Sequence, residues 1–363
     1  MFQFRDKERI GALSKALEGM VTRPMKFMEV CGTHTVSFFR FGLRSLVPDR
    51  LSLLSGPGCP VCVTPQREIR KAFHLAQQDG VILATFGDMI RVPVDSSSLE
   101  KQRAVGAHVR VVTSALEALD MARGNADKKV VFFAVGFETT APTVAQAILH
   151  AAGERLSNFF ILCAHKLIPP AMRALLDGGE VRVDGFMCPG HVSAIIGSAA
   201  YEEISARYSV PCVISGFEPL DMLETLVMLV EMAARGEARV RNQYRRVVKP
   251  QGNRVALESM GEVFDVKDAE WRGLGMIPAS GLGLKDGFAG FDAENEFDLK
   301  QVDGGEEENK GCRCGDVLRG ALAPEECPLF GVACTPSTPL GPCMVSSEGT
   351  CGAHYRYRTA RDE

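Results

Sequence analysis

The chain has 363 residues, of which 46% are hydrophobic, and a formal net charge of −4 at pH 7. This length and apolar content suffice for a sizeable core and suggest two or three domains. The charge argues against a nucleic-acid groove or an anionic membrane surface, and no apolar run approaches the ~18 residues that cross a bilayer. We therefore expect a cytoplasmic protein that binds neither nucleic acid nor membrane. Its 12 cysteines suggest metal or redox chemistry in that compartment.

The first motif in the chain is "MEVCGTHT", residues 28–35. It places Cys31 beside Gly32 and three residues before His34. A thiolate in a glycine turn next to an imidazole can act as a nucleophile or as a ligand of a soft metal. The commoner alternative for such a cysteine is a buried position at the end of a strand.

The second motif is "GPGCPVCVTP", residues 56–65, in which Cys59 and Cys62 have the CxxC spacing of a redox pair. The preceding "LSLLSGPG" predicts a strand. The following "TPQREIRKAFHLAQQ" predicts a helix with Pro65 near its first turn, and the dipole of that helix would favour a thiolate. A metal clip and a loop that merely contains thiols remain as alternatives.

Four short apolar runs predict buried parallel strands whose carboxyl ends open into loops. They are residues 80–88, 129–138, 158–166 and 210–218. Residues 114–124 and 139–153 have helical spacing, begin with Ser or Thr and end in Gly. Alternating strands and helices predict an α/β fold with Rossmann-like sheets.

The predicted strands also repeat one another. Gly-Phe-Glu ends a strand twice, with Glu138 and Glu218 in matching places, and Asp88 in "FGDMIRVP" and His191 in "CPGHVS" form a weaker second pair. The repeat predicts two related α/β domains, residues 51–150 and 151–250. Residues 1–50 would pack on them, and residues 251–363 would form a smaller, irregular domain.

Six cysteines gather in the last of these segments and suggest a metal cluster. Because the tail has no paired CxxC knuckles, an iron–sulfur cluster fits better than structural zinc, although zinc and unligated thiols remain as alternatives. Local sequence favours one set of four, with Cys343 as first reserve and Cys312 as second. The favoured ligands are Cys314, Cys327, Cys334 and Cys351.

Polar residues at strand ends lie where parallel sheets form their clefts. Each of Asp88, His191, Glu138 and Glu218 would alone be more often a helix cap or a satisfied loop group than a catalytic residue. Taken together with Cys31, Cys59 and Cys62, they suggest one functional site.

These motifs, with "GFETTAPT", "GFEPLD", "CPLFGVACTP" and "GPCMVSSEGTC", resemble the HypD family of hydrogenase maturation factors from about residue 25 to 358. The resemblance implies two α/β domains and a third that carries a 4Fe-4S cluster. It also implies a complex with the chaperone HypC, in which iron lies between a cysteine of HypC and Cys31. HypE, with HypF, would donate the cyanide, and the iron would carry cyanide and CO.

The resemblance further implies that Cys59 and Cys62 pass electrons between the cluster and the iron, by analogy with ferredoxin–thioredoxin reductase. Hydrogen-bond donors such as His34 or His191 could stabilise cyanide on the iron. We expect an assembly factor rather than a conventional turnover enzyme. The alternatives are a thiol-disulfide oxidoreductase of the ferredoxin–thioredoxin reductase type and a purely structural metal protein.

Overall fold

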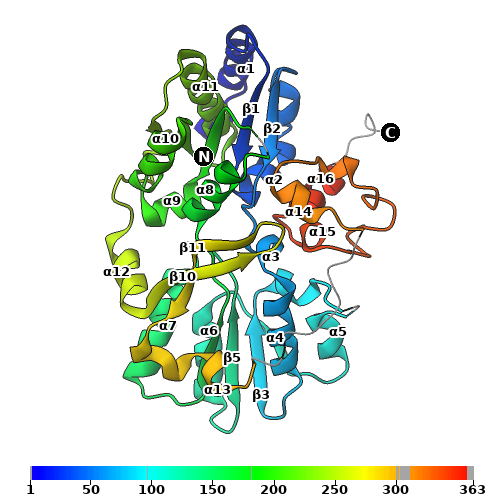
Figure 1. Ribbon diagram of the computed structural model, residues 1–363, viewed down its shortest axis with the longest axis vertical. Helices are drawn as coiled ribbons and strands as arrows, with labels where there is room; N and C mark the ends of the chain where they lie inside the picture. The colour runs from blue at the N-terminus through cyan, green and yellow to red at the C-terminus, as the bar shows by residue number, and fades with distance from the viewer. Residues whose placement is uncertain (1, 96, 181, 300–301, 303–310, 358–363) are drawn as a thin grey trace.

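The computed structural model describes residues 2–95, 97–180, 182–299, 302 and 311–357. Within them lie two parallel sheets and one antiparallel hairpin. The hairpin lies between the two sheets, and the C-terminal segment flanks both (Figure 1). None of the helices in this part of the chain is both long and apolar enough to cross a membrane.

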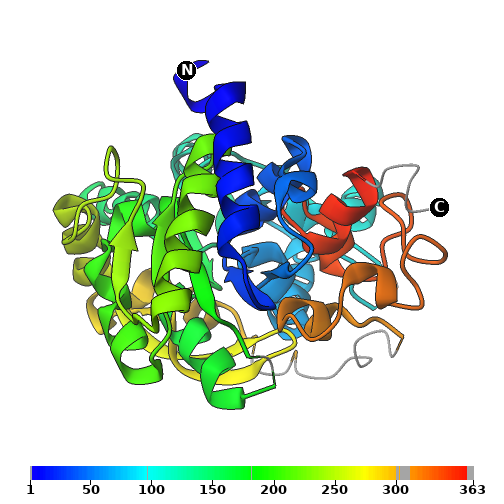
Figure 2. The ribbon, with the colours of Figure 1, turned by 90° about the horizontal axis from the view of Figure 1, so that it is seen from above.

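The first sheet has the strand order β2-β1-β7-β8-β9. Its strands are β1 (Met25–Glu29), β2 (Leu51–Ser55), β7 (Gly185–Pro189), β8 (Cys212–Ser215) and β9 (Val240–Asn242). One face packs on α1 (Lys7–Met20), α2 (Gly32–Arg40) and α11 (Pro219–Arg235). The other packs on α8 (Ile168–Gly178), α9 (Gly190–Ile196) and α10 (Glu202–Tyr208). Figure 2 shows α1 lying along α11.

The second sheet has the order β4-β3-β5-β6. Its strands are β3 (Val81–Thr85), β4 (Val109–Val111), β5 (Lys129–Ala134) and β6 (Phe159–Cys163). Alternate residues of β5 face opposite sides, as the period of a strand requires. Val130 and Phe132 pack with α6 (Ala115–Gly124) and α7 (Ala141–Gly153). Val131 and Phe133 pack in the same core as α4 (Gln66–Ala76) and α5 (Leu99–Ala104).

The remaining elements join the two sheets. They are α3 (Pro60–Val63), α12 (Arg254–Val263), the hairpin strands β10 (Phe264–Trp271) and β11 (Gly275–Leu284), α13 (Ala293–Glu296), α14 (Cys314–Leu318), α15 (Pro342–Val345) and α16 (Thr350–Tyr357). One large apolar core contains residues of both sheets, of α3, of the hairpin and of the tail. The tail therefore packs into the same core that joins the two sheets.

The prediction of an α/β fold with parallel sheets is confirmed, and each of the four predicted strands contains an observed one. The sheets, however, do not follow the predicted division at residues 50 and 150. Strands β1 and β2 pair in one sheet with β7, and β6 pairs with β5 in the other. The chain begins the first sheet, builds the whole second sheet and then returns. Local patterns reveal strands but not their partners, so the sheet to which each strand belongs does not follow from the sequence pattern.

The predicted repeat corresponds to matching places in the two sheets. Gly-Phe-Glu follows β5 before α7 and follows β8 before α11. Asp88 follows β3, the neighbour of β5, and His191 follows β7, the neighbour of β8. In both copies a Cβ on the glycine would strike a side chain of the next helix region, Thr140 or Asp221. The two turns thus share a packing arrangement as well as the Gly-Phe-Glu sequence.

Candidate functional site

A cleft of about 460 Å³ opens beyond the carboxyl ends of both sheets. Cys31 and Thr33 follow β1, Thr139 follows β5 and His191 follows β7, while Glu348 comes from the tail. The carboxyl ends of parallel strands are where α/β proteins bind ligands. The cleft is therefore the candidate functional site.

Cys31 is the residue that caps the N-terminus of α2. Burial and, after it, the nearby Glu348 carboxylate raise the pKa of Cys31 to about 12, although Thr33 and the backbone of His34 act to lower it. The thiol is thus protonated at neutral pH. A metal that binds it must displace the proton.

Two glycines allow the Cys31 loop to be held between other segments. A Cβ on Gly58 would lie 2.2 Å from the backbone N of Cys31, and one on Gly32 would lie 2.2 Å from the Glu348 carbonyl oxygen. The N–H of Gly32 donates to the Gly58 carbonyl at 3.1 Å. The Cys31 loop, the CxxC loop and the tail are therefore in backbone contact.

We expect Gly58→Ala to lower the free energy of unfolding by about 1–3 kcal/mol, the usual cost of overpacking. The added methyl meets backbone, which cannot move aside as a side chain does. Chemical denaturation measures the change. Gly11→Ala on α1, where a Cβ meets nothing within 4 Å, is the control; equal stability of the two variants would contradict the close contact.

His34 lies beneath the cleft in an aromatic stack. The ring of Phe217 lies between those of His34, at 4.5 Å, and His191, at 3.9 Å. Burial lowers the pKa of His34 to about 4, so the imidazole is neutral at physiological pH, and its Nε2 lies 3.0 Å from the Gly216 carbonyl oxygen. Of the two histidines, exposed His191 lines the cleft, whereas buried His34 lies behind Phe217 in the stack.

The two glutamates of the repeat occupy different environments. Glu138 is buried, and one of its oxygens accepts from the Ile168 N–H at 2.9 Å. Burial raises its pKa to about 7. Glu218 is half-buried and pairs with Arg5 at 2.6 Å, and it is not among the residues that line the cleft.

We expect Glu138→Gln to gain stability relative to the unmodified protein as pH rises. Between the ordinary value of 4.5 and about 7 the unfolded chain releases the Glu138 proton first. The free energy of unfolding of the unmodified protein therefore falls by about 3 kcal/mol as pH rises through that window, whereas the Gln variant lacks this loss. Denaturation at pH 4 and pH 8 measures the difference. Glu218→Gln is the matched control, since solvent reaches that carboxylate; equal pH dependence of both variants would contradict the assignment.

Cys59 and Cys62 are joined by a disulfide with their Cα atoms 5.2 Å apart. Cys59 is the N-cap residue of α3, a single turn that Pro60 begins and that contains Cys62, and the predicted helix follows after Pro65 as α4. Pro65 keeps Thr64 extended and so separates the two helices. Gly58 and Pro60 line the cleft, so the disulfide adjoins it.

Asp88 holds the tail instead of lining the cleft. Its Oδ2 accepts from the N–H and from the hydroxyl of Ser347, each at 2.8 Å. Arg91 links Asp88 to the Val345 carbonyl oxygen. The clamped segment continues into Glu348, whose carboxylate accepts from the Thr33 hydroxyl at 2.7 Å. Asp88 thereby fixes the position of Glu348.

All six tail cysteines line one small cavity of about 20 Å³, walled by apolar side chains such as Leu329 and Phe330. The sulfurs of Cys314 and Cys343 lie 2.9 Å apart. Among the described residues no group of three or more His, Cys, Asp or Glu side chains is arranged to hold a single ion. Converging thiols in an apolar wall do match the donor set of an iron–sulfur cluster, for which the thiols would have to move apart.

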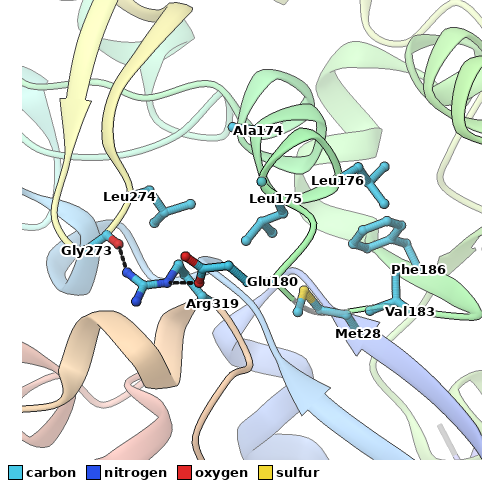
Figure 3. A pocket seen from close by; sticks show the side chains of 11 residues that line it. Met28, Ala174, Leu175, Leu176, Glu180, Val183, Phe186, Gly273, Leu274 and Arg319 are labelled. Carbon is cyan, nitrogen blue, oxygen red and sulfur yellow. Dashed lines mark hydrogen bonds and ion pairs between the residues drawn. The ribbon is translucent and has the colours of Figure 1, made fainter.

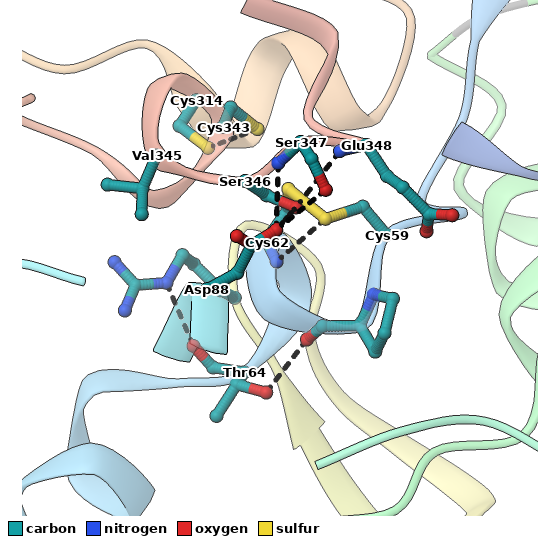
Figure 4. The surroundings of a disulfide bond; sticks show 12 residues. Cys59, Cys62, Thr64, Asp88, Cys314, Cys343, Val345, Ser346, Ser347 and Glu348 are labelled. Atoms are coloured by element: carbon teal, nitrogen blue, oxygen red, sulfur yellow. Dashed lines mark hydrogen bonds between the residues drawn. A yellow bond between two sulfur atoms is a disulfide. The ribbon is translucent and has the colours of Figure 1, made fainter. Parts of the chain in front are cut away.

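The tail cysteines lie beside the disulfide. Figure 4 shows Cys314 and Cys343 on one side of Cys59 and Cys62, with Ser346, Ser347 and Glu348 next to them. All four of these cysteines belong to the same buried core. The structure thus brings the tail, the disulfide and the Cys31 loop together.

A separate cavity of about 170 Å³ lies between α8, β7 and the hairpin (Figure 3). Met28 and Phe186 line its apolar wall, and the ion pair of Glu180 with Arg319 lies at its edge. It contains none of the residues predicted for the site.

Sequence reasoning missed Thr33, Phe217 and Glu348. Thr33 and Phe217 lie inside predicted motifs, but the prediction assigned the function to a neighbouring residue of each motif. Glu348 is separated from Thr33 by 315 positions. The only local signal for Glu348 is its place in "SSEG" between two tail cysteines.

Comparison with known proteins gives a family match over nearly the whole chain. The family described as "HypD: Hydrogenase formation hypA family" matches residues 8–358. The chain is 45% identical over 370 residues to "Hydrogenase maturation factor HypD2" of Bradyrhizobium diazoefficiens, covering 99% of this chain and 97% of that protein. It is 46% identical over 372 residues to "Hydrogenase maturation factor HypD" of Azotobacter vinelandii (99% and 98%) and 44% identical over 360 residues to that of Escherichia coli (98% and 94%).

Proposed function

The chain belongs to the HypD family of hydrogenase maturation factors, and from this we propose that it is the scaffold on which iron receives its cyanide and CO ligands. In this proposal a HypC-type chaperone and Cys31 hold the iron, and HypE, with HypF, donates the cyanide. Cys59 and Cys62 supply electrons. The observation that carries the proposal is the backbone contact that places the CxxC loop against the loop of Cys31.

Cys31 would bind the iron as its thiolate. Soft thiolates suit low-spin iron with strong-field ligands, and the N–H groups at the start of α2 favour the charged sulfur. An iron that carries cyanide is anionic, and exposed His191 lines the cleft where it could donate a hydrogen bond to such a cargo.

The tail would hold a 4Fe-4S cluster through Cys314, Cys327, Cys334 and Cys351, with Cys343 and then Cys312 as reserves. When bound, the cluster supplies one-electron transfer. Reduction of the Cys59–Cys62 disulfide takes two electrons and two protons and breaks the sulfur–sulfur bond. The contact between these groups in one buried core supports their joint role.

The thiol-disulfide oxidoreductase is the weaker candidate. Cys59 is 3% exposed and Cys62 fully buried. A disulfide of another protein could not reach either sulfur for direct exchange, which requires in-line attack by a thiolate.

We expect Cys59 and Cys62 to interconvert between dithiol and disulfide in a two-electron step. The folded protein is equilibrated at graded potentials and quenched with acid, and the thiols are then alkylated after unfolding, because both sulfurs are buried in the folded state. Cys59→Ser should abolish the step, whereas Cys163→Ser, outside the motif, should leave it unchanged. If the folded protein shows no such step, the redox role is wrong.

A further inference from the structure

Arg272 is a buried cation at the bend of the hairpin, immediately after β10. Only 5% of the residue is exposed. Its backbone N–H donates to the Val63 carbonyl at 2.8 Å, and its Nε donates to the Thr64 carbonyl at 2.9 Å. Both carbonyls belong to the turn that ends α3, one and two residues after Cys62. Arg272 therefore anchors the hairpin on the CxxC turn.

The residue after Arg272 touches the tail. A Cβ on Gly273 would lie 2.4 Å from the Cα of Gly315, the neighbour of Cys314, and Gly273 has a φ of +78° that favours glycine. Arg319 donates to the Gly273 carbonyl and pairs with Glu180 (Figure 3). The hairpin bend is thus fixed to the CxxC turn on one side and to the backbone beside Cys314 on the other.

The charge of Arg272 is buried close to the tail cysteines. The next residue, Gly273, is in backbone contact with Gly315, the neighbour of Cys314. A guanidinium removed from water loses solvation that nearby negative charge replaces. A cluster bound by the tail cysteines as thiolates would be a source of such charge.

We propose that Arg272 is a positioning residue that holds the CxxC turn against the tail cysteines and, through its charge, raises the reduction potential of a cluster bound there. This inference rests on the proposed function. A reduced cluster carries one more negative charge than an oxidised one, so a fixed buried cation stabilises the reduced form.

The test is a spectroscopic redox titration of the cluster in the full-length protein. At the potential where the unmodified protein is half reduced, Arg272→Met and Arg272→Gln should lower the ratio of reduced to oxidised cluster three- to tenfold; tenfold corresponds to 59 mV for one electron. Arg272→Lys keeps the charge and should stay within twofold. Arg272→Gln retains an N–H donor and serves as the neutral variant if Arg272→Met does not fold.

Arg313→Met is the matched control. It removes a charge next to Cys314, but the Arg313 side chain is 51% exposed and pairs with Asp316, so solvent screens it. The proposed effect of the charge would be wrong if the ratio of reduced to oxidised cluster were equal in Arg272→Met, Arg272→Gln and the unmodified protein. It would also be wrong if Arg272→Lys shifted the ratio as much as Arg272→Gln. An unmodified protein without iron–sulfur absorbance would instead refute the proposed function, and this role with it.

Discussion

Replacing Cys31 with Ser is expected to abolish iron loading of the complex with the HypC-type chaperone while leaving the iron–sulfur absorbance in place. Among the described residues that line the cleft, Cys31 is the one cysteine, and it is not among those that line the cavity of the tail cysteines. A hydroxyl is a poor ligand for iron that prefers soft thiolates. Iron and sulfide analysis of the purified complex measures both effects.

Cys163→Ser is the control for this result. The Cys163 thiol donates to the Leu282 carbonyl at 3.2 Å, a bond that a hydroxyl can keep, and it lies outside the cleft lining. Iron loading should be unchanged in this variant. Full loading in Cys31→Ser would show that iron is held elsewhere.

The second large effect is expected in the tail. Single Ala substitutions of Cys314, Cys327, Cys334 and Cys351 should each remove most of the iron–sulfur absorbance, because each would delete a cluster ligand. Cys312→Ala should retain it. Absorbance spectra of anaerobically purified variants, with iron and sulfide counts, measure the outcome.

Cys343 is the most informative comparison in this series. It is 1% exposed, and its sulfur lies 2.9 Å from that of Cys314, so the structure places it as close to the cavity as the four favoured residues. Retention of absorbance in Cys343→Ala would leave the favoured set standing. Full absorbance in a variant of any favoured cysteine would remove that residue from the set.

Much of the fold could be predicted because its strands are continuous apolar runs. Residues 129–138 and 158–166 contain β5 and β6, and their apolar composition alone predicted both strands. The pairing of β1 with β7 could not be predicted in this way, since it joins residues about 160 positions apart along the chain. Sheet membership is a long-range property, and a single sequence carries little information about it.

The structure brings some of the predicted site residues together and separates others. Cys31, His191 and the CxxC loop do meet at the cleft, because each follows a strand of a parallel sheet or adjoins it. Asp88 also follows a strand, but the tail occupies its carboxylate. Glu218 follows one too, yet its side chain pairs with Arg5 instead. A residue's place at a strand end does not determine the partner that its side chain finds.

The most direct test of the central claim is Mössbauer spectroscopy of the iron-57-labelled protein, alone and in complex with the HypC-type chaperone, with infrared spectra of the same samples. We expect cluster iron in both samples, and in the complex alone an additional low-spin iron together with the stretching bands of bound cyanide and CO. The additional iron should be absent from Cys31→Ser. A complex that contains only cluster iron, or whose additional iron persists in Cys31→Ser, would contradict the account.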